Sequence, residues 1–194
     1  MKRTLFPLML IAASALLLAM GAVACGDDDE GGGGDGGATT EPGGGDSTVL
    51  VSYLRELNDI QEGVSDATDT VGEQSEQAFS NPTQARQSLS AAIDVADSAV
   101  TALEALDVPE EASTAHAELI AAGENLVEAA TAVNDDLQGV EPGPEFDTLA
   151  EEAQAADSEL SQAIDRMVQA CESMQAVAEE NNTNVDLACP SPDA

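Results

Sequence analysis

One histidine, three cysteines and many carboxylates are the side chains from which a catalytic or metal site of this 194-residue chain would have to be built. A metal site on a helix pairs its histidine with a second ligand three or four residues away. The positions at that spacing from His116 hold no such ligand: Ala112, Ser113, Leu119 and Ile120. We therefore expect His116 to cap a polar hole at the edge of the folded domain, and we predict no metal and no cofactor.

The carboxylates say little about catalysis, because they are everywhere. The chain has 38 Asp and Glu against five Lys and Arg, which gives a formal net charge of −33. With no Trp and one Tyr there is no aromatic platform for a sugar and little apolar wall to raise the pKa of a catalytic acid. A surface of this charge repels phosphate backbones. The composition therefore argues against both an enzyme and a nucleic-acid-binding protein.

Three arginines are the only Lys or Arg residues beyond residue 25: Arg55, Arg86 and Arg166. Carboxylates such as Asp59 and Asp165 are close to them in the sequence, so we expect surface ion pairs. Pairs of this kind stabilise a fold by less than about 1 kcal/mol each.

The N-terminus has the organisation of a secretory signal. Lys2 and Arg3 precede an apolar run that ends at Met20, and small residues lead to Cys25. Two cleavage sites remain open. Ordinary signal peptidase would cut after Ala24, whereas a lipobox would make Cys25 the lipidated N-terminus. The usual lipobox leucine is replaced by Ala22. We predict a lipoprotein signal peptide over 1–24, with a lipidated Cys25.

The segment that follows cannot form a core. Residues 25–46 are rich in Gly and Asp and contain almost nothing apolar, so burial cannot offset the entropy of ordering them. We expect a flexible acidic tether between the anchor and the folded domain.

Beyond residue 46 the apolar residues recur at alternating spacings of three and four, and no alternation with a period of two competes with them. This pattern predicts an all-α fold, with helices at 47–79, 83–107, 110–138 and 145–180. Asn81 with Pro82, Pro109, and Pro142 with Pro144 mark the ends of these helices. Short connections predict an up-down-up-down antiparallel four-helix bundle over 47–181.

About half of the expected core positions are alanine, which favours helix but contributes little apolar area. The larger residues that we expect in the core, taken in chain order, are Leu50, Tyr53, Leu57, Leu89, Leu103, Leu119, Leu126, Phe146, Leu160, Met167 and Met174.

Cys171 and Cys189 are the two thiols that remain once Cys25 is lipidated, and in an extracytoplasmic protein we expect them to form a disulfide. The chain allows it, because about nine helical residues cover ~14 Å and the returning segment can span ~30 Å. The bond would hold a C-terminal tail, residues 182–194, with Val185 and Leu187 covering the end of the bundle. A redox-active pair would need a Cys-x-x-Cys motif or a cationic neighbour, and the sequence has neither.

The chain also resembles a family of secreted lipoproteins of actinobacterial type that carry a small helical domain. The residues that carry the resemblance are the run that starts Cys25-Gly26-Asp27, the turn Leu106-Asp107-Val108-Pro109, His116, and Cys171 with Cys189. The resemblance implies an anchored helical bundle and brings no activity with it.

Two hypotheses follow for function. The first is a lipid-anchored, non-enzymatic binding or scaffolding module on the extracytoplasmic face of the cell membrane, with an unidentified protein partner in the envelope. The second is an accessory or sensory subunit of a transport or signalling complex that binds a small cationic ligand or a metal. A cavity between helices with converging carboxylates would favour the second.

Overall fold

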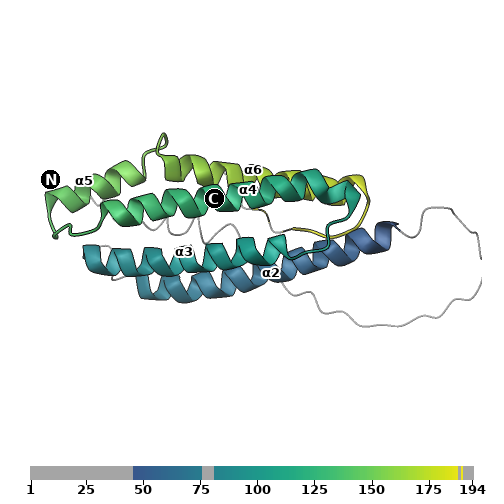
Figure 1. The fold of residues 1–194 in the computed structure, drawn as a ribbon, viewed down its shortest axis with the longest axis horizontal. Coiled ribbons are helices and arrows are strands. Elements are labelled where there is room, and N and C mark those ends of the chain that lie inside the picture. The colour runs from purple at the N-terminus through teal and green to yellow at the C-terminus, as the bar shows by residue number, and fades with distance from the viewer. Residues whose placement is uncertain (1–45, 76–80, 188, 190–194) are drawn as a thin grey trace, which may run out of the picture.

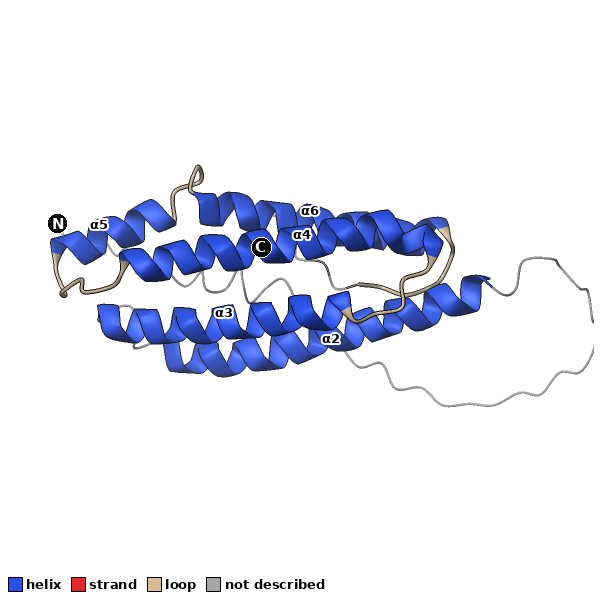
Figure 2. Ribbon diagram, in the orientation of Figure 1, coloured by secondary structure: helices blue, strands red, loops and turns tan. Residues whose placement is uncertain are grey.

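The computed structural model describes residues 46–75, 81–187 and 189. Every regular element in these ranges is helical, so the predicted all-α class is confirmed (Figure 2). The elements are α2 (Asp46–Ser75), α3 (Pro82–Glu104), the 3-10 turn η2 (Glu110–Ala112), α4 (Ser113–Asp136), α5 (Pro144–Ala153) and α6 (Glu159–Glu180). The predicted signal peptide, Cys25 and nearly all of the tether lie outside the described residues.

The long helices lie lengthwise beside one another (Figure 1). α3 packs against both α2 and α4, and α4 packs against α6. The backbones of α2 and α6 approach each other less closely than those of the other neighbouring helices. The chain after α6 turns back and runs between these two helices (Figure 1). No described helix is long and apolar enough to cross a membrane.

The start of α3 follows the sequence prediction. Asn81 is the N-cap, and its side-chain oxygen accepts a hydrogen bond from the backbone N–H of Thr83 at 2.9 Å. Pro82 occupies the first helical position, where its missing N–H costs nothing. The predicted helix boundary at Asn81 and Pro82 is confirmed.

The prediction of one continuous helix over 145–180 is wrong. α5 ends at Ala153 and α6 begins at Glu159. Ser158 is the N-cap of α6: its Oγ accepts from the N–H of Ser161 at 3.1 Å and donates to the carbonyl of Ala153 at 2.9 Å. Because a serine hydroxyl can satisfy backbone groups at both helix ends, the interruption loses little hydrogen bonding. Ala153 and Ala156 have the spacing of a continuous apolar repeat, which led to the prediction of a single helix. Ala156 is instead exposed in the connecting segment.

The core consists of two clusters of buried residues. The larger one joins α2, α3, η2, α4, α6 and the returning C-terminal segment, and it contains the fully buried Leu50, Leu54, Leu57, Met174 and Leu187. The smaller one lies between α4 and α6 around Leu126 and Leu160. α3 buries less than its repeat predicts, since Leu89 is only half-buried and Leu103 is its only buried leucine.

Gly123 of α4 marks a close approach to α3. A Cβ atom built on Gly123 would lie 2.6 Å from Cγ2 of Val100, whereas one built on Gly63 of α2 would meet nothing within 4 Å. Alanine is favoured over glycine in a helix by about 1 kcal/mol, but overpacking costs typically 1–3 kcal/mol. We expect Gly123→Ala to lower the free energy of unfolding by about 1–2 kcal/mol, measured by urea denaturation.

Gly63→Ala is the matched control, and we expect it to raise the free energy of unfolding by up to about 1 kcal/mol. If both substitutions stabilised the protein equally, α3 and α4 would not be in close contact at Val100.

Candidate functional site

His116 lies inside the fold, not at its edge, so the expectation that it caps a polar hole at the bundle edge is wrong. Only 7% of its surface is exposed, and its Nδ1 lies 2.9 Å from the hydroxyl oxygen of Tyr53 on α2. The two rings meet edge to face with their centroids 5.8 Å apart. The Tyr53 hydroxyl also lies 3.8 Å from Sδ of Met174 on α6. One polar cluster therefore connects α2, α4 and α6.

Burial makes this cluster neutral near pH 7. Desolvation raises the pKa of the Tyr53 hydroxyl, and desolvation lowers the pKa of the His116 imidazole. A neutral imidazole and a neutral phenol share one hydrogen bond in the apolar interior, which gives Nδ1 of His116 and the Tyr53 hydroxyl a partner. The arrangement specifies how three helices pack. Within the described part of the chain, no group of three or more His, Cys, Asp and Glu residues could hold a metal ion.

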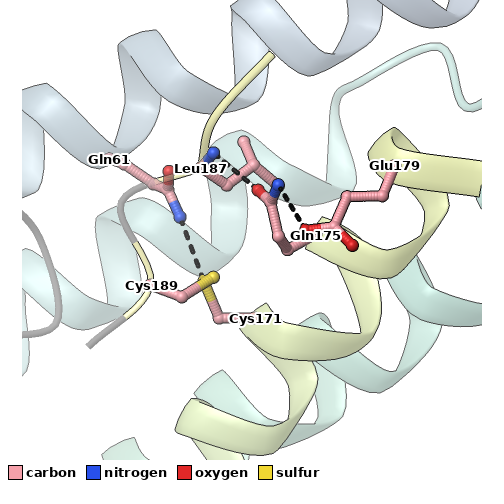
Figure 3. The surroundings of a disulfide bond; sticks show 6 residues. All are labelled: Gln61, Cys171, Gln175, Glu179, Leu187 and Cys189. Carbon is pink, nitrogen blue, oxygen red and sulfur yellow. Dashed lines mark hydrogen bonds between the residues drawn. A yellow bond between two sulfur atoms is a disulfide. The ribbon is translucent and has the colours of Figure 1, made fainter. Parts of the chain in front are cut away.

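The sulfur atoms of Cys171 and Cys189 lie 2.04 Å apart, which is disulfide-bonding distance (Figure 3). Cys171 is buried on α6, and Cys189 is half-buried in the returning segment. Gln61 of α2 points at this pair, and its Nε2 donates to Sγ of Cys171 at 3.7 Å. The sequence placed the two cysteines together, but it gave no sign of Gln61. Cys25, the predicted lipidation site, lies outside the described residues.

We call residues 183–187 together with Cys189 the C-terminal strap. It does not cover the end of the helices as expected, but lies lengthwise between α2 and α6 (Figure 1). The side chain of Leu187 is 2% exposed and belongs to the larger core cluster, which Val185 also contacts. The N–H of Leu187 donates to Oε1 of Gln175 on α6 at 2.7 Å (Figure 3). The strap thus substitutes for close contact between α2 and α6.

Arg86 was expected to form an ion pair. Its Nε instead donates to the backbone carbonyl of Asn134 at 3.2 Å, which links α3 to the last turn of α4. Helix-terminal carbonyls carry partial negative charge and lack intrahelical donors, so a guanidinium is a suitable partner for them.

A pocket of about 180 Å³ opens where α4, α5 and α6 meet. Apolar side chains line most of it, and Leu137 and Leu160 are buried there. Three exposed carboxylates, Asp136, Glu152 and Glu159, also line it. The pocket lies beside the interruption between α5 and α6, and Ala153 and Ser158 on either side of that interruption contribute to its wall.

The helix ends around this pocket add to its negative character. Asp136 is the last residue of α4 and Ala153 the last of α5, whereas Glu159 begins α6. Each helix C-terminus carries about half a negative charge and each N-terminus about half a positive charge. Two helix C-termini and three carboxylates face only one helix N-terminus at this pocket. The net negative charge favours binding of a cation. The apolar walls favour a ligand that also has a hydrocarbon part.

Sequence reasoning missed this pocket because it missed the interruption between α5 and α6. The signal was present as Asp157-Ser158-Glu159, an N-cap serine followed by an acid in the first helical turn.

Comparison with family models, with curated proteins and with solved structures found no match to this chain.

Proposed function

We propose that this chain is a lipid-anchored, non-enzymatic binding module on the extracytoplasmic face of a cell membrane. Its ligand is an organic cation with a short apolar part, and the pocket between α4, α5 and α6 is the observation that carries the proposal. The proposal joins the two hypotheses drawn from the sequence, because a module of this kind can serve as the sensory or accessory subunit of a larger envelope complex.

In this proposal α2, α3, α4 and the α5–α6 pair form an up-down-up-down antiparallel bundle. The sequence of contacts from α2 to α3, from α3 to α4 and from α4 to α6 supports that order. The Gly- and Asp-rich segment before α2 gives the bundle reach, with an r.m.s. span of ~25 Å for a chain of its length.

Anchoring through Cys25 has its own test. The run of small residues before Cys25 supports lipidation. We expect Cys25→Ser to leave an unprocessed precursor or to release the protein into the medium, as judged by fractionation of the producing cells. A processed Cys25→Ser chain that stayed in the membrane fraction would contradict the anchor. Cys189→Ser is the matched control and should leave the fractionation unchanged.

The pocket predicts selectivity for charge. We expect n-hexylammonium to raise the melting temperature in a saturable way, while hexanoate at the same concentration and ionic strength does not. At a free concentration of one hundred times Kd, a ligand that binds only the folded state stabilises it by about 2.7 kcal/mol. Glu152→Gln should weaken n-hexylammonium binding by about fivefold, which corresponds to one exposed ion pair of about 1 kcal/mol.

Glu118 provides the matched control, because it is an exposed acid of α4 that does not line the pocket. Glu118→Gln makes the same change in net charge and should leave the affinity for n-hexylammonium unchanged. If Glu118→Gln and Glu152→Gln weakened binding equally, the cation would be responding to the overall charge and the pocket would not be its site.

A further inference from the structure

A buried amide lies against the disulfide without a full set of partners. Gln61 is 8% exposed, and its Nε2 donates to Sγ of Cys171 at 3.7 Å. Its Oε1 is buried and has no hydrogen-bond partner among the described residues. A buried carbonyl oxygen without a donor destabilises the state in which it occurs. Disulfide sulfurs carry no proton, so the oxidised pair cannot supply the missing donor.

The reduced pair can supply it. A thiol at Cys171 or Cys189 has an S–H group that can donate to an amide oxygen, and a thiolate accepts from an amide N–H more strongly than a disulfide sulfur does. The single amide of Gln61 therefore fits both the thiolate that forms during reduction and the thiols that result. Its chemistry matches the reduced state better than the oxidised one.

We propose that the Cys171–Cys189 disulfide is a reducible latch, that Gln61 is the positioning residue that favours its opening, and that reduction releases the C-terminal strap from between α2 and α6. The sequence offers neither a Cys-x-x-Cys motif nor a cationic neighbour to make this pair redox-active, and in the proposal the buried amide of Gln61 takes that role. This role lies outside the pocket and does not depend on the ligand proposed for it. The reductant that the proposal requires is a dithiol, of a protein or of a small molecule.

The reaction is a thiol–disulfide exchange. A thiolate of the dithiol attacks Sγ of Cys189, the less buried of the two cysteines, and forms a mixed disulfide while the S–S bond breaks. The electron pair of that bond leaves on Sγ of Cys171, where Gln61 Nε2 donates to the new thiolate before it takes up a proton. The second thiol of the reductant loses its proton, attacks its own mixed-disulfide sulfur and expels Cys189, which is protonated in turn. Two electrons pass to the protein, and the dithiol becomes a disulfide.

Once the latch is open, little holds the part of the strap beyond Thr183, whose N–H and hydroxyl both donate to the carbonyl of Ala178 on α6. Leu187 and Val185 supply apolar burial there, and the N–H of Leu187 supplies one hydrogen bond to Gln175. Against this stands the entropy of ordering the whole strap backbone. The covalent bond is therefore what keeps the strap in place.

The first test compares hydrogen exchange in the full chain before and after reduction with dithiothreitol. We expect the amides of 185–189 to exchange at least tenfold faster in the reduced protein, while those of α4 and α6 keep their protection. Unchanged protection of 185–189 would overturn the proposal. So would a simultaneous loss of protection in all helices, because the disulfide would then hold the whole fold and not the strap alone.

The second test assigns the role of Gln61 with a pair of matched variants. Gln61→Met keeps the length of the side chain but removes its donor and its orphaned acceptor. We expect dithiothreitol to reduce this variant about tenfold more slowly than the parent chain, the factor that one hydrogen bond to a charged group supplies. Gln175→Met removes a strap contact without touching the sulfurs, and it should be reduced at least as fast as the parent.

A purely structural role for Gln61 would give the opposite result, since loosening the packing around the disulfide would speed reduction in both variants. Reduction of Gln61→Met at the parent rate or faster would overturn the assignment. An equilibrium titration against reduced and oxidised dithiothreitol gives an independent readout, in which Gln61→Met should favour the disulfide by about tenfold.

Discussion

Leu54→Ala is expected to lower the free energy of unfolding by about 2–5 kcal/mol, the range measured for fully buried leucines. Leu54 is 0% exposed and belongs to the cluster that α2 shares with α3, η2, α4, α6 and the strap. Many of its neighbours in that cluster are alanines, so few large side chains can move to fill the cavity. A loss of this size is a large part of the 5–15 kcal/mol that stabilises a typical domain. Urea denaturation followed by circular dichroism would measure it.

The control for this change is Val49→Ala in the same helix. Val49 is 55% exposed, so its truncation removes little buried area and should alter stability by less than about 0.5 kcal/mol. Equal effects of the two substitutions would mean that α2 is not packed on the core through the face that carries Leu54.

Tyr53→Phe should destabilise the protein by about 1–3 kcal/mol, because it leaves Nδ1 of His116 buried without a partner. Replacing both residues with apolar ones should cost less than the sum of the two single changes. A double-mutant cycle with His116→Leu therefore predicts a coupling energy between Tyr53 and His116. Strict additivity would show that the hydrogen bond between them contributes nothing.

The same cluster predicts a dependence of stability on pH. Burial lowers the pKa of His116 in the folded state below its value in the unfolded chain, about 6.5. The unfolded chain therefore takes up the proton first as the pH falls. The stability that the neutral His116 allows is complete above pH 6.5, and it is lost as the pH falls through the folded-state pKa. His116→Leu should flatten the fall in stability between pH 7.5 and 5.5. An unchanged pH profile in this variant would exclude His116 as its source.

The helical period predicted α4 most accurately. The expected core residues Leu119 and Leu126 are both buried, and so are Ala115 and Ala122 at the same spacing, because this helix lies between α3 and α6 and has neighbours along its length. The same period in α3 gave positions that are mostly half-buried. A repeat shows which face of a helix is apolar, but the depth of burial depends on how many helices surround that face.

The interior polar groups were the least predictable part. Tyr53 was expected in the core and His116 at the edge, yet the two share a hydrogen bond across 63 positions of sequence. A buried tyrosine hydroxyl needs a partner, which makes the chain's single histidine an obvious candidate in retrospect. Nothing comparable identifies Gln61, since its partner is the sulfur atom of Cys171, which lies 110 positions away on α6.

The pocket depends on a local competition between helix continuation and side-chain capping, and the spacing of apolar residues does not reveal which of the two prevails. Alanine at 153 and 156 continues the apolar spacing, whereas Ser158 terminates one helix and starts another. Side-chain capping prevailed because alanines at an exposed surface add little burial to a continuous helix. The pocket lies beside this interruption, and Leu149 and Leu160 line it.

The most direct test of the proposed function is a titration of the isotopically labelled full chain with n-hexylammonium, followed by amide chemical shifts at constant ionic strength. Binding in the pocket predicts saturable shifts confined to residues 129–137, 149–153 and 158–160, the segments that line it. Small shifts that spread over acidic residues of all helices and grow without saturation would contradict the account, because they would show diffuse attraction of a cation to a chain of net charge −33.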